Sequence, residues 1–222
     1  MDGYIALTEF GKRKFIEAGL PEKKIFVKPN FFFNSPEPFC NFEDYIVFIG
    51  RLSVEKGLDT LIDAFKILNS TNNKIFLKIV GDGHSRGQFE AKIKDENIQG
   101  VEFLGKKNQL GCMEIIKNAR FIVMPSICYE MFPMTTIEAF ACGKPVIASN
   151  LGALSEIIQD KKTGLLFKVG DAKDLAEKIM WLFENKDASV EMGKNALRVF
   201  EERFTRDKNY EILMDIYEKV MR

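Results

Sequence analysis

Two positively charged side chains share one short loop after a predicted strand. The strand is Tyr45–Ile49, and residues 50–57 read GRLSVEKG before a predicted helix. Gly50 leaves room at the strand end, and Arg51 and Lys56 place two cations close together. Two such cations suit a diphosphate, whose charge is otherwise costly to desolvate. The alternative is a solvated loop that carries ordinary surface charges.

A second loop leads directly into a predicted helix. Residues 125–133 read PSICYEMFP, and the helix runs from about Pro133 to Cys142. Proline is well placed in a first helical turn, where its missing N–H does no harm. The free N–H groups near Met134, Thr135 and Thr136, together with the helix dipole, would form an anion site.

Two glutamates flank that anion site. Glu130 lies in the loop, and Glu138 lies about one turn inside the helix. Carboxylates accept hydrogen bonds from sugar hydroxyls, so the pair suits a phosphorylated sugar. Glu138 could instead lie on the helix surface, but its neighbours are apolar, and a carboxylate in such surroundings usually has a partner.

Strands and helices alternate along most of the chain. Apolar residues recur at helical spacing between short β-rich runs, several of which are almost continuously hydrophobic. This alternation predicts a doubly wound α/β domain with about six parallel strands, whose ligands bind beyond the carboxyl ends of the strands. The predicted strands are Tyr45–Ile49, Ile75–Val80, Val101–Leu104, Phe121–Met124, Val146–Ala148 and Leu165–Phe167. Helices are predicted near Asp171–Glu184, Ala188–Glu202 and Arg206–Met221.

The first forty residues have a different pattern. A strand at Tyr4–Thr8, a helix over Glu9–Ala18 and a short strand at Ile25–Val27 precede a segment with three prolines, which we interpret as a linker. The segment contains three consecutive phenylalanines, residues 31–33. Because these rings are costly to leave in water, we expect them to pack on a surface, of this chain or of another domain.

Composition excludes several classes of function. Lys plus Arg and Asp plus Glu both number 32, so no overall charge indicates nucleic acid or a membrane surface. No apolar run is long enough to span a membrane. With a single histidine, His84, a multi-histidine metal site is excluded, and we expect His84 at the surface. Four cysteines without a CxxC pair are interpreted as reduced core thiols of a cytoplasmic protein: Cys40, Cys112, Cys128 and Cys142.

Taken in order, these segments resemble the GT-B glycosyltransferases, specifically the large retaining group often called family 4. Glu130 and Glu138 reproduce its E-x7-E pattern, and GRLSVEKG is similar to its phosphate loop. VGDG at residues 80–83 and EAFACGKPVIAS at 138–149, then Gly152, Glu156 and TGLLF, continue the match. Residues 5–31 resemble the segment that joins the family's two domains, so the resemblance spans nearly the whole chain.

The resemblance implies a role for each candidate residue. Arg51 and Lys56 would bind the donor diphosphate and Glu130 the sugar hydroxyls, and these three residues are expected to act in catalysis. Glu138 would bind the ribose, and the base would rest near residues 105–107. Because Pro133 stands where many members have glycine, the phosphate would take its N–H donors from Met134 and Thr135. The complete implied donor site is Gly50, Arg51, Lys56, Gly81, Gly105, Lys106, Glu130, Met134, Thr135 and Glu138.

The resemblance also implies an activity. Residues 43–222 would form a Rossmann-like donor domain, and residues 1–42 the end of an N-terminal acceptor domain with the interdomain linker. The implied reaction is retaining transfer of a hexose from a UDP-, GDP- or ADP-sugar to a glycan or lipid-linked acceptor, without a metal or other cofactor. The acceptor site, and any peripheral contact with a membrane, would belong to the rest of the N-terminal domain. We therefore expect this chain alone to bind a donor but to transfer sugar poorly.

Two other functions remain open at this point. A nicotinamide-type oxidoreductase domain would share the fold, but the GDGHSRG run at residues 81–87 is one residue too long for the dinucleotide fingerprint. A non-catalytic nucleotide-sugar-binding or regulatory module would keep the fold and lose the chemistry. The joint presence of Arg51, Lys56, Glu130 and Glu138 argues against such a loss.

Overall fold

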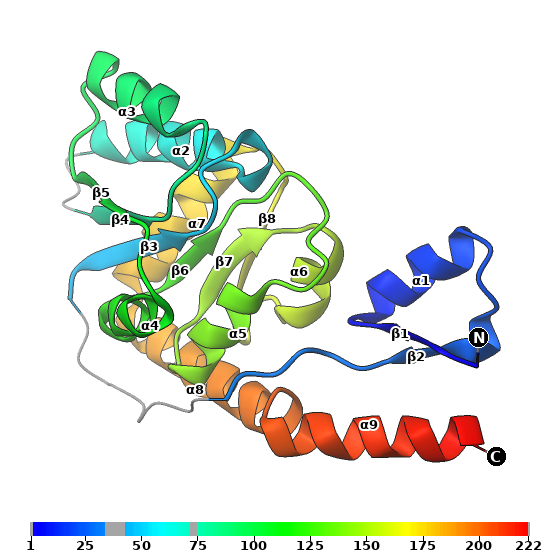
Figure 1. The fold of residues 1–222 in the computed structure, drawn as a ribbon. Coiled ribbons are helices and arrows are strands. Elements are labelled where there is room, and N and C mark those ends of the chain that lie inside the picture. Colours follow the sequence, from blue (N-terminus) through cyan, green and yellow to red (C-terminus); the bar gives the residue numbers. More distant parts are fainter. Residues whose placement is uncertain (1, 34–42, 72–74, 222) are drawn as a thin grey trace.

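The larger of two parallel sheets forms the centre of the molecule. The computed structural model describes residues 2–33, 43–71 and 75–221, and its six-stranded sheet has the order β5-β4-β3-β6-β7-β8 (Figure 1). Every strand pair in this sheet is parallel. The prediction of a doubly wound α/β domain with about six parallel strands is confirmed. The strands are β3 (Tyr45–Ile49), β4 (Phe76–Val80), β5 (Val101–Gly105), β6 (Ile122–Met124), β7 (Val146–Ser149) and β8 (Gly164–Phe167).

Helices cover both faces of this sheet, and alternate residues of each strand enter different cores. In β3, Ile46 and Phe48 pack in the core that contains α2, α3 and α7. Tyr45 and Val47 belong to the opposite core, with α4, α5, α6 and α8. Burial on both faces explains why the strand sequences are almost continuously hydrophobic. The helices are α2 (Leu58–Asn69), α3 (Arg86–Asp95), α4 (Gln109–Asn118), α5 (Met134–Ala141), α6 (Gly152–Ile157), α7 (Ala172–Glu184) and α8 (Lys186–Arg203).

The order of the strands reverses beside β3. The chain proceeds from β3 to β4 and β5 on one side, then returns to place β6, β7 and β8 on the other. Where the order reverses in this way, the loops that follow the two central strands diverge and leave a crevice at the carboxyl edge. The loops after β3 and β6 carry four of the candidate donor residues: Gly50, Arg51, Lys56 and Glu130.

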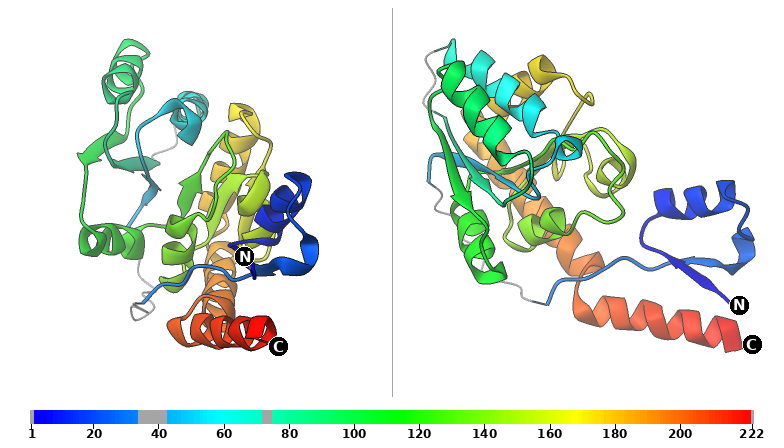
Figure 2. Two further views of the ribbon diagram at one scale, coloured as in Figure 1. Left: turned by 45° about the vertical axis from the view of Figure 1, so that its right-hand side comes forward. Right: turned by 45° about the horizontal axis from the view of Figure 1, so that its top comes forward.

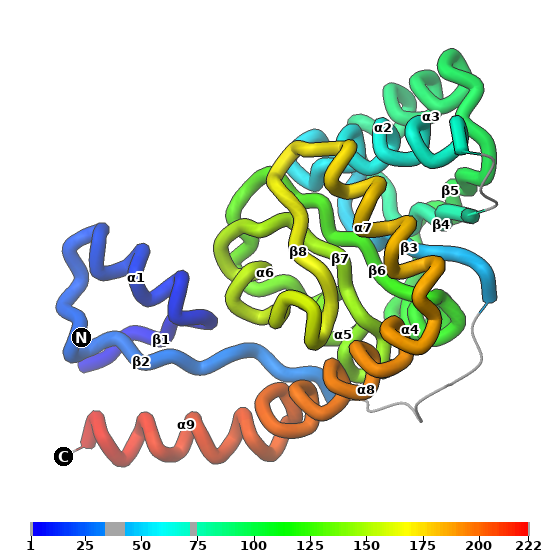
Figure 3. The backbone as a smooth tube through the Cα atoms, turned by 180° about the vertical axis from the view of Figure 1, so that it is seen from behind, coloured from blue at the N-terminus to red at the C-terminus, as the bar shows by residue number. Residues whose placement is uncertain are grey.

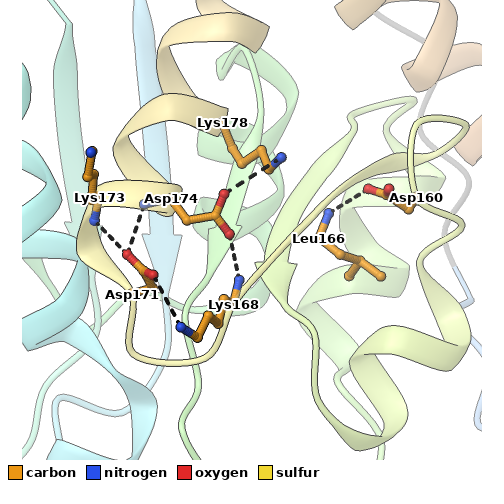
Figure 4. Close-up of polar contacts among 7 residues, drawn as sticks. All are labelled: Asp160, Leu166, Lys168, Asp171, Lys173, Asp174 and Lys178. Atoms are coloured by element: carbon orange, nitrogen blue, oxygen red, sulfur yellow. Dashed lines mark hydrogen bonds and ion pairs between the residues drawn. The ribbon is translucent and has the colours of Figure 1, made fainter.

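A chain of polar contacts holds the turn between β8 and α7 (Figure 4). The Asp171 carboxylate accepts hydrogen bonds from the N–H groups of Lys173 and Asp174, at 3.2 and 3.1 Å, and so caps the start of α7. Asp174 in turn accepts from the N–H of Lys168 at 2.8 Å. On β8 itself, the Asp160 carboxylate accepts from the N–H of Leu166 at 2.9 Å. These contacts are local and lie among α7 and β8, away from the crevice beside β3.

The first elements form a separate small unit, here called the N-terminal unit. It contains β1 (Tyr4–Ala6), α1 (Glu9–Glu17) and β2 (Ile25–Val27), and β1 pairs with β2 in parallel outside the six-stranded sheet. Figure 2 shows this unit to one side of the larger sheet. The predicted strand–helix–strand pattern is confirmed here, whereas its assignment to an acceptor domain stays a prediction.

The last helix, α9 (Arg206–Met221), leaves the main domain and runs beside the N-terminal unit (Figure 3). The side chain of Asn209 accepts a hydrogen bond from Lys28 Nζ at 3.0 Å and donates one to the carbonyl of Pro29. Just before α9, the carbonyl of Phe204 accepts from the N–H of Phe32 at 3.0 Å. The two segments that connect the units are therefore hydrogen-bonded to each other.

The three consecutive phenylalanines do not behave alike. Phe32 is buried in the main core, as expected, and belongs to the same cluster as Phe204. Phe33 is 71% exposed and touches Phe31, with ring centroids 4.8 Å apart. Phe32 therefore packs on a surface of this chain, whereas the packing of Phe33 against another domain stays a prediction.

The cysteines also differ from the expectation of core thiols. Cys142 is buried, and desolvation raises the pKa of its thiol to about 12. Cys112 and Cys128 are only half-buried, although desolvation raises the pKa of each thiol as well. Cys40 lies outside the described residues. The three described cysteines are free and are held in the protonated form by their surroundings.

Candidate functional site

The loops after β3 and β6 enclose a cavity of about 280 Å³ at the carboxyl edge of the sheet. Phe48 and Phe132 form part of its wall, and polar groups from both loops and from the start of α5 complete it. Six of the sequence-predicted donor residues line it together: Gly50, Arg51, Lys56, Glu130, Met134 and Thr135. This cavity is called the donor cavity below.

Close contact between the two loops positions Lys56. It ends a short 3-10 turn, Val54–Lys56, and Gly57 follows with φ +70°. A Cβ at Gly57 would lie 1.8 Å from the carbonyl oxygen of Pro125, so only glycine permits this approach. The N–H of Ile127 also donates to the carbonyl of Glu55 at 3.0 Å. The loop after β3 is thereby attached to the loop after β6.

Glu130 is the centre of a small polar network. Its Oε1 accepts a hydrogen bond from Lys56 Nζ at 2.7 Å and another from Ser126 Oγ at 2.6 Å. Glu130 is 13% exposed and Lys56 26%, while Ser126 is buried. Both donors use the same carboxylate oxygen, and no hydrogen bond from the residues that the structure describes reaches Oε2, which can therefore accept from a ligand.

The start of α5 supplies backbone donors. Pro133 precedes the helix and is buried, and its carbonyl accepts the N–H of Thr136 at 3.0 Å. Met134 and Thr135 are the first two helical residues, and residues at these positions have N–H groups with no acceptor inside the helix. These N–H groups and the positive end of the helix dipole lie at the donor cavity.

Glycines at neighbouring strand ends bring the backbone close together. Gly81, after β4, has φ +137°, and a Cβ there would lie 1.8 Å from the carbonyl oxygen of Gly50. The N–H of Gly81 donates to the carbonyl of Gly105 at 3.0 Å. Gly81, Gly105 and the exposed Lys106 are not among the residues that line the donor cavity. They lie at the same carboxyl edge of the sheet, at the ends of the neighbouring strands β4 and β5.

Glu138 lies apart from the other candidate carboxylate. It is half-buried in α5, and desolvation raises the pKa of its side chain, an effect that a hydrogen bond with Gln109 opposes. Gln109 begins α4, directly after the residues predicted to hold the base. The structure therefore places Glu138 beside the β5–α4 connection and outside the lining of the donor cavity.

Sequence reasoning missed two residues of the site, Ser126 and Gln109. Each one hydrogen-bonds a predicted carboxylate, Ser126 with Glu130 and Gln109 with Glu138. For Ser126 a signal existed, since a small polar residue directly follows a strand and stands four residues before a glutamate. No sequence signal pointed to Gln109, because Glu138, with which it hydrogen-bonds, lies in another helix.

Within residues 2–33, 43–71 and 75–221, no group of three or more His, Cys, Asp or Glu side chains could hold a metal ion. No helix in the same part of the chain is long and apolar enough to cross a membrane. His84 is exposed, as expected for a surface residue.

Comparison with known sequences identifies relatives. The model of the family Glycosyl transferases group 1 matches residues 35–199. An uncharacterised glycosyltransferase of Methanocaldococcus jannaschii is 33% identical over 174 residues, which cover 78% of this chain and 48% of the relative. The poly(ribitol-phosphate) α-N-acetylglucosaminyltransferase of Staphylococcus aureus is 27% identical over 222 residues, covering 98% of this chain and 44% of the relative. The chain spans about half the length of the curated relatives it matches.

Solved structures share the fold. A variant of S. aureus TarM, crystallised with UDP among its ligands, superposes with a TM-score of 0.86 at 24% identity, covering 98% of this chain and 44% of TarM. Anabaena HepE in complex with UDP gives a TM-score of 0.84 at 24% identity, covering 99% of this chain and 64% of HepE. The family match decides against a nicotinamide-type oxidoreductase. The chain belongs to the Glycosyl transferases group 1 family and has the fold of the GT-B glycosyltransferases.

Proposed function

We propose that the donor cavity binds the diphosphate and sugar of a nucleotide-sugar donor, for retaining transfer of a hexose to a glycan or lipid-linked acceptor. The observation that carries this proposal is the convergence of Arg51, Lys56, Glu130 and the start of α5 on one cavity. Two cations and a helix N-terminus match a diphosphate, and a largely buried carboxylate matches sugar hydroxyls. The non-catalytic module would not need this complete set.

Lys56 can serve the diphosphate and Glu130 at the same time. Its ammonium group has three N–H donors, and the contact with Glu130 Oε1 uses one of them. The other donors are available to phosphate oxygens, as is the exposed guanidinium of Arg51. When the bond between the sugar and the diphosphate breaks, negative charge grows on the leaving group. Preorganised cations and backbone N–H groups would stabilise that charge without a metal ion.

The two glutamates would divide recognition of the donor between them. Glu130 Oε2 would accept from the sugar hydroxyls, while Ser126 and Lys56 hold the opposite oxygen. Glu138, beside the β5–α4 connection, would accept from the ribose hydroxyls, with the base near residues 105–107. The distribution of the two carboxylates over adjacent regions supports a ligand that extends along the sheet edge from β6 to β5.

Relatives with named activities leave the sugar open. They include an O-antigen chain mannosyltransferase of Escherichia coli and the N-acetylglucosaminyltransferase of S. aureus. Because UDP is present in the structures of TarM and HepE, UDP-sugars are the first donors to test. The use of a nucleotide-sugar donor fits the cytoplasmic location expected from the sequence, which is part of this proposal.

The first experiment measures nucleotide binding. Thermal shift with UDP-, GDP- and ADP-sugars selects the nucleotide, since a ligand that binds only the folded state raises its stability. Calorimetry then compares the wild type with Glu138→Ala, which should lose about 1.5–3 kcal/mol of affinity for the selected nucleotide. Glu177→Ala, on the exposed side of α7, is the matched control and should bind as the wild type. EDTA should leave the affinity unchanged. If no nucleotide binds, the proposal is wrong.

Transfer is measured separately. The chain is incubated with its tightest-binding nucleotide sugar and a mixture of acceptors, and free sugar and glycosylated product are both followed. We expect slow hydrolysis of the donor at most, because closing a cleft between two domains is what orients an acceptor and excludes water. Rapid transfer would show that the acceptor site lies within these 222 residues.

A further inference from the structure

Glu156 connects the main domain to the start of α1 in the N-terminal unit. Its Oε1 accepts a hydrogen bond from the N–H of Glu9 at 2.8 Å, and its Oε2 accepts from the N–H of Phe10 at 2.6 Å. The side chain of Thr8, within the N-terminal unit, accepts from the N–H of Gly11 at 3.0 Å. A carboxylate at the positive end of a helix interacts favourably with both the N–H groups and the dipole. Residues 147 positions apart in sequence thus form one helix cap.

An aromatic contact lies beside this cap. The rings of Phe10 and Tyr129 have centroids 4.8 Å apart. Gly152, the first residue of α6, faces both rings, and a Cβ there would lie 3.1 Å from Tyr129 and 3.3 Å from Phe10. Lys14 Nζ lies 5.7 Å from the centroid of each ring. Together the Glu156 cap and the Phe10–Tyr129 contact are called the clasp.

Tyr129 belongs to the same loop as Glu130, the predicted sugar-binding residue. Along this loop the side chains alternate: Ile127, Tyr129 and Met131 are exposed, whereas Ser126 is buried and Glu130 is 13% exposed. The outward residues of the loop therefore face the N-terminal unit or solvent, and the inward residues line the donor cavity. Tyr129 is the chain neighbour of Glu130, so the ring contact with Phe10 acts on the segment that carries Glu130.

We propose that Glu156 is a positioning residue for the donor site: it holds α1 against α6, and through Phe10 and Tyr129 it keeps Glu130 oriented towards the sugar. The link to sugar binding rests on the proposed function, whereas the link between Glu156 and the loop stands on the contacts alone. The clasp acts on the loop after β6, which carries Glu130. It reaches Lys56 only through Glu130 and the contact between the two loops, so it should affect recognition of the sugar more than recognition of the diphosphate.

Amide hydrogen exchange of the ligand-free chain tests the link to the loop. Glu156→Ala should speed exchange at Glu9 and Phe10 and also across residues 126–132. Thr8→Ala is the matched control, because it removes a cap from the same helix end without cutting the connection to α6. In Thr8→Ala, faster amide exchange should be confined to α1. Phe10→Ala should reproduce the loop effect of Glu156→Ala. Unchanged exchange of residues 126–132 in Glu156→Ala would overturn the proposal.

Calorimetry tests the link to the sugar, with UDP and UDP-glucose as one pair of probes and GDP and GDP-mannose as the other. In Glu156→Ala the affinity for the sugar nucleotide relative to its bare nucleotide should fall about tenfold, because a small misplacement of a binding group has a large effect. Glu156→Gln, which keeps the shape and one acceptor oxygen, should show a smaller loss. Equal losses for both members of a pair would indicate general destabilisation and contradict the proposed role. If the wild type bound none of the four probes, the proposed function would fail, and hydrogen exchange would still decide the clasp.

Discussion

Two hollows in this molecule differ both in their size and in the residues that line them. The larger, of about 600 Å³, lies among β8, α7 and α8 and has Lys178, Trp181 and Met192 in its lining. Trp181 is 44% exposed, and the charged residues there, such as Glu177, are on the surface. The donor cavity, at about 280 Å³, contains the buried Ser126 and the nearly buried Glu130.

The difference bears on the proposed function, which assigns the donor to the smaller of the two hollows. The donor cavity lies where the strand order reverses, so strand ends, two loops and a helix N-terminus converge there. Lys178, in the lining of the larger hollow, instead forms a local ion pair with Asp174 on the same helix. Substitutions in the two regions should therefore affect different properties.

The largest expected effect is on stability at the strand ends. Gly81→Ala should lower the free energy of unfolding by about 3–5 kcal/mol, because its Cβ would meet the carbonyl oxygen of Gly50 and its φ of +137° is strained for alanine. Gly170→Ala, in the turn before α7, is the control. That glycine has φ +73° but nothing within 4 Å, so its loss should be about 1–2 kcal/mol. Urea denaturation measures the free energy of unfolding of both variants. Equal losses would contradict the close approach of residue 81 to the carbonyl oxygen of Gly50.

The next effect is on nucleotide binding. Lys56→Ala should weaken the binding of UDP by about 1.5–3 kcal/mol, because it removes a charge-assisted contact with the diphosphate. Lys178→Ala removes a lysine from the larger hollow and should change the affinity by less than about 0.5 kcal/mol. Calorimetry at constant salt measures both variants. A loss of similar size in Lys178→Ala would mean that general charge, and not the donor cavity, attracts the nucleotide.

A smaller effect concerns the helix cap at the start of α7. Asp171→Ala should lower the free energy of unfolding by about 1 kcal/mol, because two N–H groups at the start of α7 lose their acceptor. The affinity for UDP should not change. Urea denaturation and calorimetry on the same protein preparation give the two values, and a weakened affinity would show that the two regions are coupled.

The smallest effect is a pH dependence within the donor site. Desolvation raises the pKa of Glu138 above the ordinary glutamate value of 4.5, so this residue ionises later than an exposed glutamate as the pH rises. If ribose hydroxyls donate to the ionised form, the affinity for UDP should increase by a few-fold, worth less than about 1 kcal/mol, as the pH rises above 4.5. Glu138→Gln should lack this pH-dependent part of the affinity for UDP. Comparing the two proteins removes the titration of the nucleotide itself.

The raised pKa of Glu138 affects the stability of the fold in the direction opposite to its effect on affinity. Because the folded protein binds the proton of Glu138 more tightly than the unfolded chain, the contribution of this group to stability is present at low pH and is lost as the pH rises through its folded pKa. Across this range the free energy of unfolding of Glu138→Gln minus that of the wild type should therefore rise with pH, as measured by urea denaturation of both proteins. A difference that falls as the pH rises would contradict the raised pKa.

The sequence was sufficient for the fold because its strands carry a local signal. Runs such as Tyr45–Ile49 are hydrophobic on both faces, and the helices between them have regular apolar spacing. The short helix α6, Gly152–Ile157, was not predicted, since six residues that begin with glycine give no helical period. The start of α8 at Lys186 was placed two residues late for a similar reason, because helix ends have weak signals.

The candidate site was only partly predictable. Loops after parallel strands meet at one edge, so the approach of Arg51 to Glu130 followed from the order of the elements. The ion pair between Lys56 and Glu130 did not, because these residues were assigned to different parts of the donor. The cap formed by Glu156 could not be predicted at all. Its partner is the backbone of α1, which has no side-chain signature and lies far away in the chain.

The hydrogen bonds between the two connecting segments have a mechanical consequence. Phe32 is hydrogen-bonded to Phe204, and Pro29 to Asn209. The two segments that run between the main domain and the N-terminal unit therefore lie against each other. The clasp at Glu156 attaches the N-terminal unit to the main domain a second time, through α1 and α6. We expect the unit to reorient more readily when the clasp is open, because one of these two attachments is then lost.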